Sequence, residues 1–311
     1  MTRSTAPGSG TEPPAARTSA GGSAGGSAGG SAPLPGVAPL PGVAGTRAQR
    51  RARLRWAVLP PVGALLLGLA GWQLVITLFG IPGYLLPSPA TMLRTVAAEL
   101  TTIGTPTWVT MREAYVGFLL AGVGGVLAGL VMSRWRLLER GLYPYLIILQ
   151  TVPIVAIAPL FVVWLGPGAV TNTVVAAMIA LFPVAANTLA GLKSTDRNLV
   201  QLYTMAGASP LVRLLSLRLP GALPAILTGL RVAAGAAVIG AIVGEFVAGV
   251  GGGQGGLGYV ITESAVQLRT PELFLAVLGA CLVSLLLFGA VVLVERRLLG
   301  RWHESALPAE E

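Results

Sequence analysis

The sequence has 311 residues, of which 54% are hydrophobic and 11% charged, and its mean hydropathy is +0.76. A soluble globular protein carries about 25% charged residues, so the composition excludes a soluble fold and indicates an integral membrane protein. The net charge of +9 does not indicate a nucleic-acid-binding protein, because the basic residues lie mainly between and beside the apolar runs. The single cysteine, Cys281, excludes a disulfide framework and a cysteine-based metal site.

Residues 1–55 form a low-complexity segment, in which GGSA occurs three times within 21–32 and PLPGVA twice within 33–44. Such a segment buries too little apolar surface to offset the entropy lost on ordering, so we expect a disordered cytoplasmic tail. The tail ends in a basic cluster just before the first apolar run. This position favours a positive-inside anchor over a lipid or nucleic-acid docking site, and the cluster comprises Arg47, Arg50, Arg51, Arg53 and Arg55.

Six apolar runs follow, each about long enough to cross roughly 30 Å of hydrocarbon as a helix. They lie at 57–79, 108–132, 142–165, 170–190, 226–248 and 273–294. Of the 21 basic residues, 17 fall in four segments, namely 1–56, 133–141, 191–225 and 295–311. Because cytoplasmic segments are rich in Lys and Arg, the sequence predicts an all-α bundle of six transmembrane helices in the inner or plasma membrane, with both termini in the cytoplasm.

Two segments outside these runs have helical character. Residues 89–103 follow the turn Leu86-Pro87-Ser88-Pro89, and we expect them to form a helix on the outer surface. In the cytoplasmic loop 191–225, Leu199, Leu202, Tyr203 and Ala206 recur with the spacing of one helix face.

Gly207 follows that helix at the position where a glycine commonly ends one. Ser209 and Pro210 then supply the N-cap and the first-turn proline of a second short helix, which carries Leu211, Leu214 and Leu215. This helix–glycine–helix elbow either docks a soluble partner or packs beneath its own bundle.

The elbow also carries a sequence motif, in which Gly207-Ala208-Ser209 precedes Leu217-Arg218-Leu219-Pro220 with nine residues between Gly207 and Leu217. The motif resembles the cytoplasmic signature of binding-protein-dependent ABC importer permeases, which is Glu-Ala-Ala, three residues, Gly, nine residues and Ile-x-Leu-Pro. Where the family has Glu-Ala-Ala, this chain has Gln201-Leu202-Tyr203, so the family's carboxylate is replaced.

The resemblance covers about 56–302. Further matching stretches are Pro224, Thr228-Gly229-Leu230-Arg231, Gly244-Glu245 and Gly256-Leu257-Gly258-Tyr259. Three others are similar to the nitrate, sulfonate and taurine branch of the family, namely Leu86-Pro87-Ser88-Pro89, Pro153 with Ala158-Pro159-Leu160, and Glu295-Arg296-Arg297.

The resemblance implies a permease domain over 56–302, followed by a short cytoplasmic tail, 303–311. It implies a transport subunit rather than an enzyme, working as a homodimer with a cytoplasmic ATPase dimer and an extracytoplasmic substrate-binding protein. ATP and magnesium would bind the ATPase, so we expect no catalytic residue, cofactor or metal in this chain. The residues implied to contact the ATPase are Gln201, Leu202, Tyr203, Ala206, Gly207, Ala208, Ser209, Leu219 and Pro220.

The substrate that this branch implies is nitrate or a small organic anion such as a sulfonate or taurine. The alternative is a thiamine-precursor pyrimidine or riboflavin. The stretch Gly244-Glu245-Phe246 and the Gly-Leu-Gly-Tyr motif resemble permeases for those compounds, and the spans hold no cluster of arginines for an anion.

Polar residues within the apolar runs are candidates for the transport pathway, because a polar group in hydrocarbon usually faces a cavity or a partner. Glu245 either lines the pathway or pairs across the bundle, or it lies at the interface in water. Gln150 and Asn187 either bind substrate or join helices, and Arg231 is expected to be an interfacial anchor. Prolines 144, 153 and 159 should bend the third span.

Two other classes of function compete with this reading. An ion-coupled secondary transporter usually buries several ionisable groups, whereas Glu245 stands nearly alone among the predicted spans. A membrane scaffold without transport would leave the elbow only partly explained. The chain lacks a GxxxxGK[ST] loop, and its GxGxxG match at Gly251, Gly253 and Gly256 follows a span rather than a strand, so we expect no nucleotide site.

Overall fold

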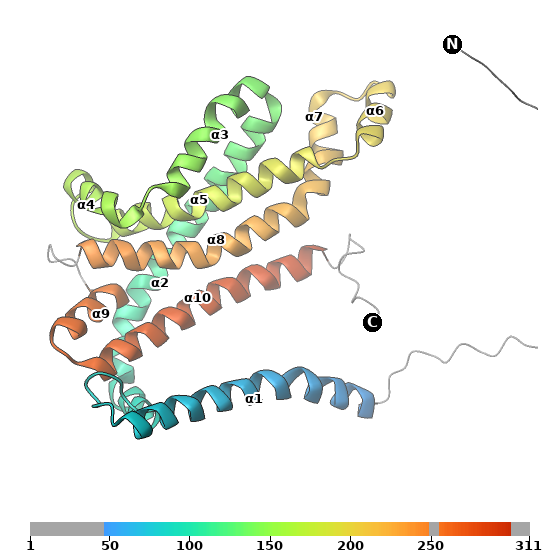
Figure 1. Ribbon diagram of the computed structural model, residues 1–311. Coiled ribbons are helices and arrows are strands. Elements are labelled where there is room, and N and C mark those ends of the chain that lie inside the picture. The colour runs from blue at the N-terminus through green and yellow to red at the C-terminus, as the bar shows by residue number, and fades with distance from the viewer. Residues whose placement is uncertain (1–46, 249–254, 300–311) are drawn as a thin grey trace, which may run out of the picture. The chain divides into compact units, whose positions relative to one another are not determined.

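The computed structural model describes residues 47–248 and 255–299, and the regular structure within these ranges is helical, as predicted (Figure 1). Two compact units divide at Pro60, and all the packing described below lies within the second unit, from Pro61 onward. The elements are α1 (Arg47–Phe79), α2 (Pro89–Arg134), α3 (Arg136–Thr151), α4 (Ile154–Leu165), α5 (Ala169–Lys193), α6 (Arg197–Met205), α7 (Pro210–Arg213), the π-helical segment η1 (Leu214–Arg218), α8 (Leu219–Ala248), α9 (Leu257–Val266) and α10 (Thr270–Leu299).

The tail was predicted to extend to residue 55, whereas α1 begins at Arg47. The segment 47–56 consists largely of Arg, Ala and Leu, which are strong helix formers, so the helix of the first span extends back through it. The remainder of the predicted tail, 1–46, and the C-terminal segment 303–311 lie outside the described residues.

Five segments of the described chain are long and apolar enough to cross a membrane, and they are Leu59–Phe79, Thr101–Arg134, Ala169–Lys193, Pro210–Ala248 and Thr270–Leu298. The remaining predicted run, 142–165, folds as α3 and α4, which are bent by 100° and form either a broken sixth span or a re-entrant loop. The bend falls at Pro153, which has no amide hydrogen to continue the helix. Pro144 and Pro159, expected to contribute to the bend, lie inside α3 and α4.

The expected surface helix over 89–103 is instead the first part of α2. The Ser88 hydroxyl caps this helix by accepting a hydrogen bond from the Thr91 amide at 3.1 Å, and Pro106 is accommodated within it. At about 1.5 Å per residue, the 46 residues of α2 extend about 69 Å, more than twice the roughly 30 Å of a bilayer core. The first turns of α2 therefore extend beyond the hydrocarbon.

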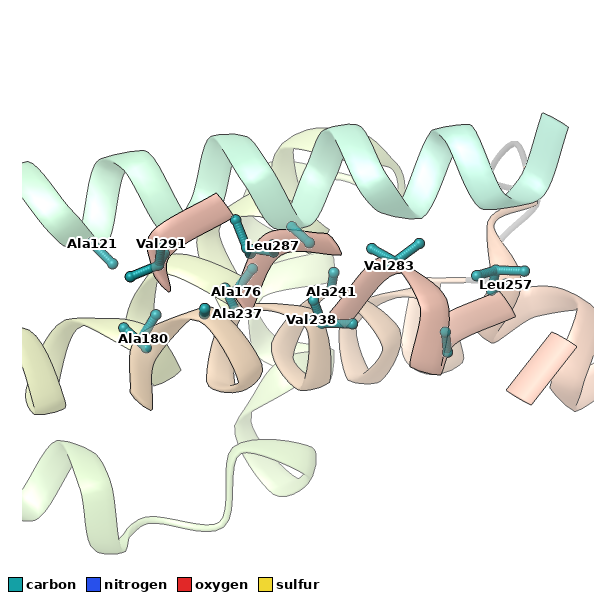
Figure 2. Packing of buried hydrophobic residues seen from close by; sticks show 14 of the residues in the cluster. Ala121, Ala176, Ala180, Ala237, Val238, Ala241, Leu257, Val283, Leu287 and Val291 are labelled. Atoms are coloured by element: carbon teal, nitrogen blue, oxygen red, sulfur yellow. The ribbon is translucent and has the colours of Figure 1, made fainter. Parts of the chain in front are cut away.

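The centre of the bundle is α5, which packs against α2 on one side and α8 on the other. Small side chains fill this contact, among them Ala176, Ala180, Ala237 and Ala241, and Figure 2 shows them beside the larger Val283 and Leu287 of α10. Small residues let membrane helices approach closely, and the closeness is measurable here. A Cβ atom at Gly125 of α2 would lie 2.6 Å from the Cβ atom of Val184 on α5.

Candidate functional site

The elbow forms from the local signals that the sequence carries. The Asp196 carboxylate caps α6 by accepting a hydrogen bond from the backbone amide of Asn198 at 2.8 Å. Gly207 ends the helix in the left-handed region, at φ 74°, and the next amide, that of Ala208, donates to the Tyr203 carbonyl at 2.9 Å. The Ser209 hydroxyl accepts from the Val212 amide at 3.3 Å and begins α7. The predicted helix boundaries on both sides of Gly207 are confirmed.

The second helix of the elbow differs from the expected one. After the four residues of α7 the chain widens into the five-residue π-helical segment η1 and passes directly into α8 at Leu219. Pro220 has no amide hydrogen to donate to the carbonyl group four residues earlier. The preceding turn is therefore free to widen. The span predicted to begin at residue 226 is therefore continuous with the elbow.

Helix α6 is the exposed part of the elbow. All nine of its residues are at least partly exposed, and the apolar side chains of Leu202 and Met205 are 60% and 86% exposed. Contiguous apolar surface of this kind on a polar loop usually marks a contact with another protein. The other residues that the motif implies for docking also reach the surface, with Gln201, Ala206, Gly207, Ser209 and Pro220 exposed and Tyr203, Ala208 and Leu219 half-buried.

The other end of the elbow is attached to the bundle. Leu214 of η1 and Leu219 pack against a buried cluster formed by Leu192 of α5 with Ala222 and Ile226 of α8. The Arg213 guanidinium donates to the Thr204 hydroxyl at 2.7 Å and so joins α7 to α6. These contacts connect α6, through α7 and η1, with α5 and α8, the two helices at the centre of the fold.

Glu245 lies near the far end of α8 and is buried, with 3% of its surface exposed. One carboxylate oxygen accepts a hydrogen bond from the Thr110 hydroxyl of α2 at 2.6 Å, and the other accepts from the Gly258 amide at 2.5 Å. The Thr110 hydroxyl also accepts from the Leu257 amide at 2.8 Å. Glu245 therefore pairs across the bundle, joining α2 and α8 to the first turn of α9, and does not lie in interfacial water.

A second carboxyl group, that of Glu113 on α2, lies within hydrogen-bonding reach of Glu245 and is equally buried. The Glu113 carboxyl group accepts a hydrogen bond from the side-chain amide of Asn172 on α5 at 3.0 Å. Within the described residues, neither carboxyl group forms a salt bridge. The expectation that Glu245 stands nearly alone is wrong, because Glu113 lies beside it.

The glycines that flank this polar cluster make room for it. A Cβ atom at Gly256 would lie 2.2 Å from a carboxylate oxygen of Glu245, and one at Gly258 would lie 2.7 Å from the Glu245 Cβ atom. A Cβ atom at Gly244 would lie 2.7 Å from the Asn172 Cα atom. The Gly244-Glu245 pair and the Gly-Leu-Gly-Tyr stretch, which are separate in the sequence, thus form one structural unit.

The other pathway candidates do not join this cluster. Gln150 is exposed near the end of α3, and the Asn187 side chain donates to the Pro183 carbonyl of its own helix at 2.8 Å. Arg231 of α8, expected to be an interfacial anchor, forms an ion pair with Glu295 of α10.

Sequence reasoning missed Glu113, Thr110 and Asn172. Glu113 carried a usable signal, since an ionisable residue inside an apolar run deserved the same consideration as Glu245. Thr110 and Asn172 carried none, because their hydrogen bonds depend on how α2, α5 and α8 pack against one another.

Residues 121–301 match the family described as binding-protein-dependent transport system inner membrane component, and this range contains the elbow, Glu245 and the flanking glycines. The chain belongs to this family. It is thus the permease subunit of an ABC importer and a multi-pass inner-membrane protein. This subunit is a transport component and not an enzyme, because ATP is hydrolysed by a separate ATPase partner. The family predicted from the sequence motifs is confirmed.

Several relatives cover most of the chain. It is 35% identical to the formylaminopyrimidine transport permease ThiX of Halalkalibacterium halodurans, covering 80% of this chain and 98% of that one. It is also 35% identical to the riboflavin transport system permease RibX of Chloroflexus aurantiacus, covering 83% and 96%. With the putative aliphatic sulfonates transport permease SsuC of Bacillus subtilis the identity is 31%, over 76% and 85%.

The fold is shared with a solved structure. The MetNI methionine ABC transporter in an inward-facing conformation matches with a TM-score of 0.50 and 20% identity, covering 63% of this chain and 98% of that one.

Proposed function

We propose that two copies of this chain form a pathway that receives a small organic solute from an extracytoplasmic binding protein and releases it into the cytoplasm. A partner ATPase dimer, which binds ATP and magnesium, docks on the elbow. The observation that carries this proposal is the set of exposed apolar side chains on the amphipathic helix α6, which is joined at one end to the core of the bundle. The residues needed are those of the predicted permease domain, 56–302, together with the basic cluster Arg47–Arg55 that anchors the orientation, whereas residues 2–45 of the tail are dispensable.

The proposed orientation places the elbow and both termini in the cytoplasm. Its support is the distribution of charge, since 17 of the 21 basic residues fall in the four segments on that side. The elbow is the longest of these segments apart from the tail, and it belongs on the side where ATP is available.

Movement of the elbow is proposed to reach the outer end of the bundle through α8. This helix has 30 residues and is therefore about 45 Å long, and η1 leads into it without a break. Leu219 at its start packs against the core, and Glu245 near its end holds the first turn of α9. Closure of the ATPase dimer would then shift α8 and alter the polar cluster at the other side of the membrane.

The substrate class that we favour is a neutral heteroaromatic compound related to the pyrimidine and flavin substrates named for ThiX and RibX. The support for this choice is the 35% identity to both of these relatives over most of the chain. A sulfonate or taurine-like anion is the second candidate, supported by the similarity to SsuC.

The experiment is calorimetry on the cognate binding protein, with riboflavin, formylaminopyrimidine, taurine and nitrate as ligands. A heteroaromatic ligand should bind, and the loaded binding protein should stimulate ATP hydrolysis by the reconstituted complex. Binding and stimulation by taurine alone would contradict the substrate proposal in favour of the second candidate. A complex whose ATPase responds to no loaded binding protein would contradict the proposed assembly.

A further inference from the structure

A groove of about 740 Å³ lies between the end of α2 and the elbow. One wall comes from the last turn of α2 and Trp135, and the other from α7 and η1. Two membrane spans meet at this point, because Thr101–Arg134 ends there and Pro210–Ala248 begins there. Arg and Trp at the end of a span, as Arg134 and Trp135 are here, commonly lie at a membrane interface, so we take the groove to lie among the headgroups.

Three arginines line the groove, namely Arg134, Arg213 and Arg218. Among the residues that the structure describes, none of them forms a salt bridge, whereas nearby Glu139 is already paired with Lys193. Arg134 lies over the ring of Trp135, 5.5 Å from its centroid, as interfacial Arg–Trp pairs do. The groove thus offers three positive charges without an acidic counterpart among the residues that the structure describes.

The rest of the lining is apolar and includes Leu130, Val131, Leu211 and Leu214. From Val131 an exposed apolar strip continues along α2 into the span at intervals of three or four residues, through Leu127, Val123 and Leu120. A ligand that matches the whole surface has an anionic head in the groove and a hydrocarbon tail along this strip.

We propose that the groove binds the headgroup of an anionic phospholipid, whose acyl chain lies along α2. Arg218 and Arg134 bind the phosphate from opposite walls, while Arg213 also holds the Thr204 hydroxyl of α6 at 2.7 Å. The bound lipid joins the end of α2 to the elbow. It thereby fixes the position of the surface to which the ATPase binds. A soluble anion has no tail to match the strip, and Arg134 and Trp135 lie at the end of a span, where lipid headgroups are found, so the surface fits a phospholipid best. The assignment to the cytoplasmic leaflet rests on the proposed orientation.

The test uses the full chain, purified in detergent and stripped of lipid, with native mass spectrometry counting bound phosphatidylglycerol or phosphatidylcholine. Each arginine near an anionic headgroup contributes about fivefold in affinity, so replacing both Arg134 and Arg218 by Gln should weaken phosphatidylglycerol binding about 25-fold. Phosphatidylcholine binding should not change. Replacing both by Lys should keep most of the preference, and Arg140→Gln, on exposed α3 outside the groove, should keep all of it.

Four results would overturn the proposal. The wild-type chain binding both lipids equally, or the Gln pair binding phosphatidylglycerol as the wild type does, would exclude a specific headgroup site. Displacement of the lipid by excess inorganic phosphate would show a site for a free anion instead. A Gln pair that keeps the lipid but loses the ATPase would make the groove a protein contact. Because the lipid assay requires neither ATPase nor transport, it can fail while the proposed function stands.

Discussion

Glu245 shows how a single polar residue can organise the end of α8 that lies far from the elbow. Its carboxylate accepts hydrogen bonds from α2 and from the first turn of α9, and three glycines leave room for the cluster around it. An acid placed in hydrocarbon without partners costs about 2.5–3.5 kcal/mol on insertion scales. The hydrogen bonds offset part of that cost, and they make the position of α9 depend on α8.

We expect Glu245→Gln to insert normally but to lose one hydrogen bond, because the amide places a donor against the Thr110 or Gly258 donor. The free energy of unfolding should fall by about 1–3 kcal/mol, and ATP-driven uptake should fall by more than the amount of protein in the membrane does. The measurements are thermal unfolding in detergent and uptake normalised to abundance.

The matched control for that variant is Glu263→Gln, which removes an exposed carboxylate from α9 that lies 3.9 Å from Arg269. Its effect should stay below about 1 kcal/mol, as for other exposed ion pairs. Equal stability and uptake in the Glu245 variant and this control would show that the cluster has no role in transport.

At the scale of the helices, the contact between α2 and α5 depends on glycine. Cβ atoms at Gly117, Gly125 and Gly129 would each lie 2.6 Å from a side-chain atom of α5. Such a distance cannot be accommodated without separating the helices. The contact is central, because α5 also packs against α8 and so connects the elbow with the rest of the bundle.

We expect Gly125→Ala to lower the free energy of unfolding by about 1–3 kcal/mol through overpacking against Val184. The control is Gly104→Ala on the same helix, because a Cβ atom added at this position would have no neighbour within 4 Å among the described residues. That control should be neutral, or more stable by up to about 1 kcal/mol, because Ala favours a helix. Thermal unfolding of the two variants side by side gives the comparison, and an equal loss in both would contradict this account of the packing.

The elements differ in how far the sequence could predict them. Local signals decided the elbow, since Asp196, Gly207 and Ser209 act within a few residues of their own positions. The continuity of α2 through Pro106 and the size of the bend at Pro153 depend on surrounding helices, so no local pattern could predict them.

The pairing of Glu245 with Glu113 depended in turn on the register between α2 and α8. No signal within either helix specifies that register. The motif could therefore indicate the family while leaving the polar cluster unseen.

At the scale of the whole molecule, the proposed orientation places the elbow on one side of the membrane and the loop between α1 and α2 on the other. Tyr84 in that loop is 62% exposed, and Met205 on the elbow is 86% exposed. Cys281 is the single cysteine, so Cys281→Ser gives a background free of thiols.

In this background, a membrane-impermeant maleimide added to intact spheroplasts should label Tyr84→Cys. It should label Met205→Cys only after the membrane is permeabilised. The opposite pattern would reverse the proposed orientation and place the elbow out of reach of any cytoplasmic ATPase.

The central claim is that the elbow couples this chain to its ATPase, and Gly207 tests it most directly. At φ 74° a side chain is strained, although a Cβ atom there would have no neighbour within 4 Å among the described residues. Valine should therefore distort the turn at a cost of about 1–2 kcal/mol, whereas asparagine tolerates the left-handed region.

The measurement is the amount of ATPase that co-purifies with tagged permease at equal abundance in the membrane. The amount of ATPase that co-purifies with the Gly207→Val variant should be lower than with the wild type by a factor of at least about five. The Gly207→Asn variant should retain nearly all of its ATPase. Gly207→Val complexes that keep their ATPase and transport at the wild-type rate would contradict the account.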